Sequence, residues 1–356
     1  MTSSAVHAAA IRVPESVLRA FTESAFRALN VPADDAVTAA NTLIEADLRG
    51  IGSHGVARLD RFYLRPLELG LINPRPRWIV RAETPSTASI DADGGLGLSV
   101  GARAMDLAIA KARESGSGWV TVANSRHFGA AGVYATRALG HDMIGIGMTN
   151  TGPIVLPAGG AEARLGSNPI AVAAPTADGS PFLFDAATSV VSAGTFDTYH
   201  RQGKRVPIGW GLTDDLQPLR DPARGPGGRR ILPLGSDLEH SAHKGYGLAL
   251  LVEALGSAVT GTYASASGLL MGGSIIAVHP GALVGAETYG EGVRQLVARM
   301  HGTPPAAGFD QVLVPGEPES MNRANNRAAG IEIADATAAN IRDAAAGLGV
   351  AAGPLA

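Results

Sequence analysis

Apolar residues near the start of the chain recur at the spacing of amphipathic helices. Two stretches, residues 15–29 and 34–48, each gather their apolar side chains near one helical face. These side chains are Leu18, Phe21, Phe26 and Leu29 in the first stretch and Val37, Ala40, Leu43, Ile44 and Leu48 in the second. Pro32 precedes the second stretch and Gly50 follows it, as is usual at helix ends. The pattern predicts a helical lobe at the beginning of the chain.

From about residue 87 the pattern changes to short apolar runs that alternate with helical stretches. The strand-like runs lie within 86–95, 119–123, 143–149, 169–175, 181–187 and 274–280, and the helical ones at 100–114, at 130–139 before Gly140, and from Lys244 onward. The order strand, loop, helix, strand over residues 119–149 predicts a βαβ-like unit. Residues 201–237 are rich in Gly, Pro, Arg and Asp and predict a long loop region. A polar helical segment is expected at the C-terminal end.

The composition narrows the possible functions. Of the 356 residues, 46% are hydrophobic and only 5% aromatic, so we expect a sizeable, mainly aliphatic core. A net charge of −3 without a basic stripe argues against a nucleic-acid partner. The chain has no cysteine, which excludes disulfides and thiolate metal sites and fits a reducing compartment. The most apolar run, residues 246–261, contains Glu253 and is too short to span a membrane, and no secretory signal is evident, so we expect a cytoplasmic protein.

One short stretch, RGIGSHGVARLDRF, has the G-x-G-x-x-G spacing of a dinucleotide-binding loop, formed by Gly50, Gly52 and Gly55. Such a loop needs a buried strand before it and a helix after it. The preceding residues instead have a helical period and carry Glu45 and Asp47, where a buried strand would be apolar. The sequence therefore favours a glycine-rich turn between helices over a phosphate-binding loop.

The same stretch carries Ser53 and His54, with Arg58 four residues after the histidine. Histidine titrates near neutral pH and can pass a proton in either direction. The planar arginine side chain pairs with a carboxylate through two parallel hydrogen bonds. If a short helix begins near residue 54, both side chains lie on one face. Together they suit a 2-keto or 2-hydroxy acid, with Arg58 on the carboxylate, His54 exchanging the proton at C2 and Ser53 orienting the ring or the substrate. A surface pair without a function is the alternative.

Seven motifs occur in a fixed order along the chain. They are GSHGVARL (52–59), SRHFGAAGVY (125–134), LGSNPIAVAAP (165–175), FDAATS (184–189), VPIGWGL (206–212), HKGYGLALLVE (243–253) and VLVPGEPE (312–319). Together they resemble the malate/L-lactate dehydrogenase family of the second type, over about residues 15 to 350. That family also includes ureidoglycolate, sulfolactate and diketogulonate oxidoreductases and a piperideine-2-carboxylate reductase.

The resemblance implies an α/β fold with a non-Rossmann mixed sheet, an N-terminal helical lobe and NAD(H) or NADP(H) as cofactor. Residues 1–85, joined by the C-terminal segment 290–356, would form the lobe for substrate and dimer contacts, and residues 86–289 the cofactor-binding domain. The implied activity is an oxidoreductase that transfers a hydride between the cofactor and C2 of a small 2-keto or 2-hydroxy acid such as malate or lactate. The implied partners are this small-molecule carboxylate and a second copy of the chain, in a homodimer with active sites near the subunit interface.

The resemblance also implies roles for individual residues. His54 corresponds to the proton donor, supported by Ser53, and Arg58 to the ligand of the substrate carboxylate. His127 is a second catalytic candidate or a cofactor ligand, and Ser167 is a candidate substrate contact. The remaining cofactor-binding positions are Phe128, Gly129, Ala130, Ala131, Asn150, Thr151, Asp185, Ala186, Ala187, Lys244, Pro315, Gly316 and Glu317. The small residues of HFGAA, which open a helix, would let backbone N–H groups approach a pyrophosphate.

Two features depart from the family pattern. Thr195, a candidate substrate-binding residue, stands where the hydroxy-acid members usually have Lys and the ketimine reductase has Asp. Two alternatives therefore stay open: a ketimine reductase acting on piperideine- or pyrroline-2-carboxylate, and a cofactor-binding homologue with impaired catalysis. The link into the helix at Lys244 is longer than usual and carries His240 and His243. Without a third ligand nearby, we expect no metal site.

Overall fold

Two helices, α1 (Glu15–Ala28) and α2 (Ala33–Leu48), form the start of the chain in the computed structural model, as predicted. The structure describes residues 10–176, 181–222, 230–262 and 270–351. Phe26 and Ile44 are fully buried where the two helices pack together, whereas Val37, expected on the apolar face, is 40% exposed. The spacing thus predicted the helices correctly and the edge of the buried face less well.

The chain divides into two compact units, residues 1–75 with 319–356, and residues 76–318. In the first unit, α2 is followed by a 3₁₀ turn η1 (Val56–Arg58), a π-helical turn η2 (Leu59–Leu64) and α3 (Arg65–Glu68). Strand β1 (Ala10–Val13) pairs antiparallel with β11 (Ile331–Ala334), which lies between helix α10 (Glu317–Ala329) and helix α11 (Asp335–Gly347). The C-terminal residues 319–356 therefore belong with the N-terminal helices.

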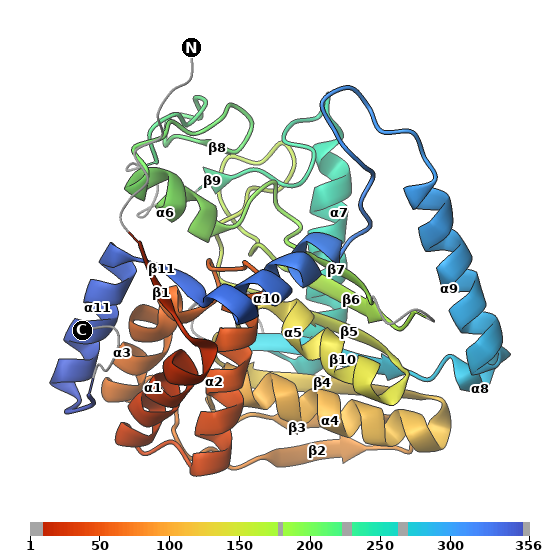
Figure 1. Cartoon of the computed structure of the whole chain (residues 1–356), viewed down its shortest axis with the longest axis horizontal. Coiled ribbons are helices and arrows are strands. Elements are labelled where there is room, and N and C mark those ends of the chain that lie inside the picture. The colour runs from red at the N-terminus through yellow and green to blue at the C-terminus, as the bar shows by residue number, and fades with distance from the viewer. Residues whose placement is uncertain (1–9, 177–180, 223–229, 263–269, 352–356) are drawn as a thin grey trace. The chain divides into compact units, whose positions relative to one another are not determined.

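The second unit is built on a mixed seven-stranded sheet in the order β2-β3-β4-β10-β5-β6-β7 (Figure 1). Its strands are β2 (Ile79–Glu83), β3 (Thr87–Asp91), β4 (Ser117–Ser125), β5 (Ile144–Thr149), β6 (Ile170–Ala174), β7 (Phe182–Ala186) and β10 (Met271–Val278). Among these described strands, β3 and β4 pair in parallel, across helix α4 (Gly97–Ser115), and the other neighbouring pairs are antiparallel. The prediction of a mixed sheet in an α/β fold is confirmed.

The predicted βαβ-like unit over residues 119–149 is only partly right. Strand β10, from far along the chain, inserts between β4 and β5 and pairs antiparallel with both. The helix between them is also shorter than expected, because α5 (Ala131–Ala135) continues as a 3₁₀ turn, η3 (Thr136–His141). Asp142, in the left-handed conformation, closes this turn in place of Gly140. A local pattern cannot reveal a strand that arrives from more than a hundred residues away.

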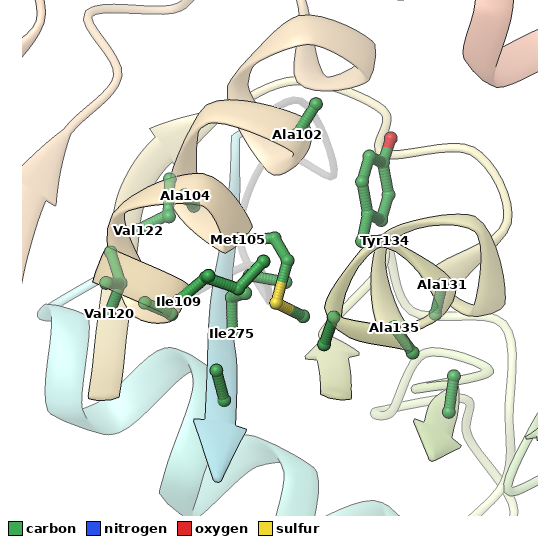
Figure 2. Close-up of a cluster of buried hydrophobic side chains, with 14 of the residues drawn as sticks. Ala102, Ala104, Met105, Ile109, Val120, Val122, Ala131, Tyr134, Ala135 and Ile275 are labelled. Atoms are coloured by element: carbon green, nitrogen blue, oxygen red, sulfur yellow. The ribbon is translucent and has the colours of Figure 1, made fainter. Parts of the chain in front are cut away.

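Helices α4 and α5 cover one face of this sheet, where an aliphatic core forms (Figure 2). Met105 and Ile109 of α4, Tyr134 of α5 and Ile275 of β10 are buried in a single cluster. A Cβ atom added to Gly145 would lie 2.1 Å from the carbonyl oxygen of Ala135, so glycine lets the helix approach the strand. Small side chains therefore set the close spacing of helix and sheet.

Several elements were not predicted. They include the strands β1, β2 and β11, the short strands β8 (Gly211–Leu212) and β9 (Arg230–Ile231), and the helices α6 (Ala193–Arg201), α8 (Gly281–Val284) and α9 (Ala286–His301). The expected helix near Lys244 is α7 (Ala242–Val252), which passes into a π-helical turn η5 (Glu253–Ser257) and a 3₁₀ turn η6 (Ala258–Thr260). Part of the expected loop region 201–237 lies outside the described residues. None of the helices described is both long and apolar enough to cross a membrane.

Candidate active site

The loop that follows α2 brings Ser53, His54 and Arg58 together in the first unit. The Ser53 Oγ atom lies 2.9 Å from His54 Nδ1, and Arg58 Nε donates a hydrogen bond of 2.8 Å to the carbonyl oxygen of Ser53. The helix here begins only at Val56, so His54 precedes it and the expected shared helical face does not exist. Ser53 instead connects the two side chains, through its hydroxyl group to His54 and through its carbonyl oxygen to Arg58. Arg58 also lies over the ring of Phe62, 5.2 Å from its centre.

The buried carboxyl group of Asp47, in the last turn of α2, holds this loop through a hydrogen bond. Its Oδ2 atom accepts a 2.8 Å hydrogen bond from the N–H of Val56. A Cβ atom on Gly55 would lie 1.8 Å from Asp47 Oδ1, so only glycine fits beside the carboxyl group. Asn326 of α10 donates to the carbonyl oxygens of Asp47 and Leu48 at 3.3 and 3.0 Å. The G-x-G-x-x-G stretch therefore forms a turn between helices, and Gly55 leaves the space that the Asp47 side chain occupies.

Asp47 was missed as a site residue by the sequence analysis, although a signal was present. An acidic residue in the last turn of a helix faces the negative end of the helix dipole and is unfavourable there. Such a residue needs another reason to be present, which here is the hydrogen bond to the loop that carries His54.

Burial shifts the proton affinities of both groups, in opposite senses. Burial of the His54 ring, and second the positive charge of Arg58, lower the pKa of His54 to about 4. Burial raises the pKa of Asp47 to about 7, although its bond from Val56 acts the other way. Near neutral pH, His54 is therefore uncharged and available to accept a proton.

Replacing Asp47 by asparagine is expected to change how stability depends on pH. Between about pH 4 and 7 the native state holds a proton on Asp47 that the unfolded chain has released, so this group destabilises the fold as pH rises. His54 acts oppositely between about pH 4 and 6.5, because there the unfolded chain holds the extra proton. The two slopes oppose each other in the native protein.

In Asp47→Asn the amide oxygen still accepts from Val56, and only the His54 slope remains. The free energy of unfolding of the variant, relative to the native protein, should therefore rise with pH by up to about 1.4 kcal/mol per unit. Urea unfolding followed by circular dichroism between about pH 4.5 and 6.5 measures it. Parallel pH profiles for the two proteins would contradict the buried, protonated Asp47.

The segment HFGAA lies in the second unit and is held tightly. Phe128 is buried, its carbonyl oxygen accepts a hydrogen bond from Tyr134 Oη, and the two rings pack with centres 4.2 Å apart. His127 Nδ1 accepts a 3.3 Å bond from the N–H of Gly129, whose φ of 76° lies in the left-handed region. Ala130 is buried beside them. The backbone is thus shaped without bulky side chains, which suits close contact with a ligand.

The start of α5 is bonded to strand β7. Asp185 of β7 accepts a 2.8 Å hydrogen bond from the N–H of Gly132, the second residue of the helix after Ala131. The N–H of Gly132, which follows the HFGAA segment, therefore binds a carboxylate of the chain itself, and the expected cofactor role of HFGAA stays a prediction. This bond is again long-range, since β7 lies about fifty residues further along. Ala186 and Ala187 follow, both half-buried.

The segment Pro315–Gly316–Glu317 is fastened to the same strand. Leu183 of β7 donates its N–H to the carbonyl oxygen of Pro315 at 3.0 Å. Glu317 accepts a 2.9 Å bond from the N–H of Val314 and forms a 2.7 Å ion pair with His301. Strand β7 therefore brings two of the expected cofactor segments side by side, the one at Asp185 and the one at 315–317.

The remaining candidates fall into two groups. Thr151 and Ser167 are joined by a 3.0 Å bond from the N–H of Ser167 to Thr151 Oγ1, and the buried Asn150 precedes Thr151 in the chain. Thr195, in the first turn of α6, contacts Ser192 through their hydroxyl groups at 3.1 Å, and Lys244 is exposed in the first turn of α7.

The histidines near Lys244 lie on the link into α7. His240 forms a 2.8 Å ion pair with Asp237. In the parts of the chain that the structure describes, no three His, Cys, Asp or Glu side chains are grouped to hold a metal.

Comparison with known proteins identifies the family to which the chain belongs. The chain is 47% identical to a malate dehydrogenase of Pyrococcus abyssi over 252 residues, which cover 70% of this chain and 69% of that one. It is 40% identical to an L-sulfolactate dehydrogenase of Methanocaldococcus jannaschii over 301 residues, 82% and 85% of the two chains. The crystal structure of malate dehydrogenase from Entamoeba histolytica superimposes with a TM-score of 0.92 at 29% identity, covering 96% of this chain and 99% of that one. The family model described as malate/L-lactate dehydrogenase matches residues 13–342, and this chain belongs to that family.

Proposed function

We propose that this protein is a nicotinamide-dependent dehydrogenase that oxidises a small 2-hydroxy acid at C2, or reduces the matching 2-keto acid. The observation that carries the proposal is the joined set of Ser53, His54 and Arg58, because it pairs a proton-transfer group with a carboxylate-binding group. It occurs in a family whose named relatives here act on malate and sulfolactate. The enzyme is an oxidoreductase acting on CH–OH groups.

Arg58 binds the carboxylate of the substrate. Its Nε atom donates to the carbonyl oxygen of Ser53, and we propose that the substrate carboxylate meets the guanidinium group through its terminal nitrogens. The bond at Nε also fixes the plane of the guanidinium group. Because Phe62 packs against this group, the side chain is oriented before the substrate arrives.

His54 accepts the proton of the C2 hydroxyl group during oxidation and returns it during reduction. For Nε2 to be the accepting atom, Nδ1 must carry the hydrogen and donate it to Ser53 Oγ, 2.9 Å away. Ser53 thus orients the ring and selects its tautomer. A carboxylate bound to Arg58 offsets the positive charge that helps to lower the pKa of His54. Substrate binding therefore prepares the ring to hold the proton it receives.

The second unit supplies the residues for the cofactor, which accepts the hydride when bound. The backbone around Gly129, with its left-handed conformation and small neighbours Ala130 and Ala131, suits a flat ring or a chain of phosphates. Asp185 already occupies the N–H of Gly132, so we propose that HFGAA contacts the cofactor through the backbone before that residue. His127, bonded to the N–H of Gly129, shapes this loop, which favours its role as a cofactor ligand over proton transfer.

The substrate class follows from the relatives and from position 195. Malate and sulfolactate share a 2-hydroxy carboxylate with a second acidic group, so we propose an acid of this kind. Thr195 offers a hydroxyl group, already bonded to Ser192, where a cation is usual in the family. Compared with a cation at this position, we expect Thr195 to weaken the preference for an acid with a second charge and to leave proton transfer by His54 unchanged.

A homodimer in the cytoplasm remains a proposal as well. Helix α9 supports the dimer, because none of its residues is buried and Tyr289, Val293, Leu296 and Met300 follow one another along one face. The cytoplasmic location rests on the composition of the chain alone.

A substrate panel tests the proposed function. Purified protein is given malate, lactate or sulfolactate with NAD⁺ or NADP⁺, and the matching keto acids or piperideine-2-carboxylate with the reduced cofactors, followed by absorbance at 340 nm. We expect turnover of at least one 2-hydroxy acid and a lower kcat/KM with the cyclic imine. Turnover of the imine alone would support the ketimine reductase, and cofactor binding without any turnover the impaired homologue.

A further inference from the structure

Glu253 places a carboxylate in the middle of a buried polar cluster in the second unit. Its Oε1 atom accepts a 2.9 Å hydrogen bond from Asn168 Nδ2, and its Oε2 atom accepts one of 3.3 Å from Asn150 Nδ2. Ser257 Oγ donates to the same Oε2 atom. The side chains of Asn150, Asn168 and Ser257 are at most 2% exposed. An acceptor with two oxygens suits these three donors. An apolar residue at position 253 would remove the acceptor of Asn150 Nδ2 and leave Asn168 and Ser257 with only the carbonyl oxygens of Ala249 and residue 253.

The two asparagines also accept hydrogen bonds from the backbone near the ends of two strands. Asn168 Oδ1 accepts the N–H of Thr151 at 3.1 Å, and Asn150 Oδ1 accepts the N–H of Gly272 at 2.9 Å. Thr151 Oγ1 in turn accepts the N–H of Ser167 at 3.0 Å. Glu253 is therefore linked through one asparagine to Thr151 and, by one further bond, to Ser167.

Asn168 is held in a conformation that few residues adopt. Its φ of 36° lies in the left-handed region, at a position where it is fully buried. Hydrogen bonds of its side chain offset the cost of this conformation. Its Nδ2 atom donates to Glu253 and, at 3.2 Å, to the carbonyl oxygen of Ala249, and its Oδ1 atom accepts from Thr151. Strained backbone at a buried position persists only when its surroundings fix it.

The helix that carries Glu253 changes its winding at this residue. Helix α7 ends at Val252, and η5 continues as a π-helical turn from Glu253 to Ser257. Turns of this kind are rare and are often found at functional sites. The turn is bonded to the centre of the sheet, because Ser274 Oγ of β10 donates to the carbonyl oxygen of Leu255. Ile275, the next residue, faces the α4 core, so Glu253 approaches from the opposite face.

We propose that Glu253 is a positioning residue for the active site. It holds together the two ends of the connection between β5 and β6. This fixes the position of Thr151, which meets the cofactor, relative to that of Ser167, which meets the substrate. The roles of Thr151 and Ser167 rest on the proposed function, whereas the hydrogen bonds that Glu253 makes do not.

A pair of substitutions that exchanges donor and acceptor tests this role. In Glu253→Gln an amide N–H₂ opposes the N–H₂ of an asparagine, and in Asn168→Asp two carboxylates oppose each other. In the double variant the new amide at position 253 can donate to the new carboxylate at position 168, which still accepts from Thr151. We expect each single variant to lower kcat/KM by about tenfold or more, mainly through higher KM values for cofactor and substrate, and the double variant to recover at least a third of that loss on a logarithmic scale.

Amide hydrogen exchange provides a readout that does not depend on catalysis. Peptides that contain Thr151 and Ser167 should exchange faster in Glu253→Gln and return towards the native rate in the double variant, while peptides from α1 stay unchanged. Glu114→Gln, exposed on α4, is the matched control and should behave like the native protein. Native protein that turns over no 2-hydroxy acid would refute the proposed function and leave the exchange test in force. Unchanged exchange at Thr151 and Ser167, or a double variant no better than either single one, would overturn the positioning role.

Discussion

Replacing His54 by glutamine is expected to lower kcat/KM for oxidation of a 2-hydroxy acid by about 10²- to 10⁴-fold at neutral pH. General base catalysis by a positioned side chain contributes about this much, and glutamine cannot accept the proton. Glutamine keeps a polar group near Ser53 Oγ, so the loop and its bond to Arg58 should persist. The fall should appear mainly in kcat, because we propose that Arg58 binds the carboxylate and that residues of the second unit bind the cofactor.

A surface histidine provides the control for this substitution. His141, at the end of η3, is exposed and bonds Arg113 at 2.7 Å. His141→Gln should leave kcat/KM and the melting temperature at their native values. A His54→Gln enzyme with native folding and near-native kcat would show that the proton is transferred by another group, with His127 the next to be tested.

Replacing Arg58 by glutamine is expected to lower kcat/KM by about 10²- to 10³-fold, largely through a higher KM for the substrate. Charge-assisted hydrogen bonds to a carboxylate are stronger than those between neutral groups, and the substitution removes both of the bonds proposed for Arg58. Arg58→Lys should recover little, because an ammonium group cannot reproduce the planar pair of donors. The loss should be small for an alcohol substrate that has no carboxylate.

The charge of Arg58 also lowers the pKa of His54, second to burial. Without it, the pKa of His54 should move up from about 4, so the acid limb of the kcat/KM profile should shift to higher pH in Arg58→Gln. Arg61→Gln is the matched control, because Arg61 also lies over the Phe62 ring, at 5.8 Å, on an exposed part of the same turn. An unchanged KM in Arg58→Gln would remove the carboxylate-binding role.

Local patterns explain which parts of the fold could be predicted. The helices α1 and α2 follow from spacing within fifteen residues, and Ser53, His54 and Arg58 lie within six positions of one another. Their joining through the carbonyl oxygen of Ser53 needed the structure, because it depends on a 3₁₀ turn that begins at Val56. The sequence predicted these three residues as a set, the structure joins them by hydrogen bonds, and their catalytic roles remain predictions.

Long-range contacts account for what the sequence did not reveal. The insertion of β10 between β4 and β5, and the bond from Gly132 to Asp185, each join segments more than fifty residues apart. Asp47 and Glu253 were read only as charges that interrupt apolar patterns, yet each accepts the hydrogen bonds that hold a loop of candidate site residues. In both cases the available signal was a charged side chain within an apolar pattern, because burying a charge is costly unless it is hydrogen-bonded.

The pH dependence of kcat/KM for oxidation of the best 2-hydroxy acid, measured side by side for the native enzyme and His54→Gln, tests the central claim most directly. We expect the native enzyme to keep its activity from neutral pH down to about pH 5 and to lose it as the pH approaches 4, where His54 takes up a proton. The variant should be slower by about 10²-fold or more at neutral pH and should lack this acid limb. A variant that retains both the rate and the acid limb would contradict the assignment of proton transfer to His54.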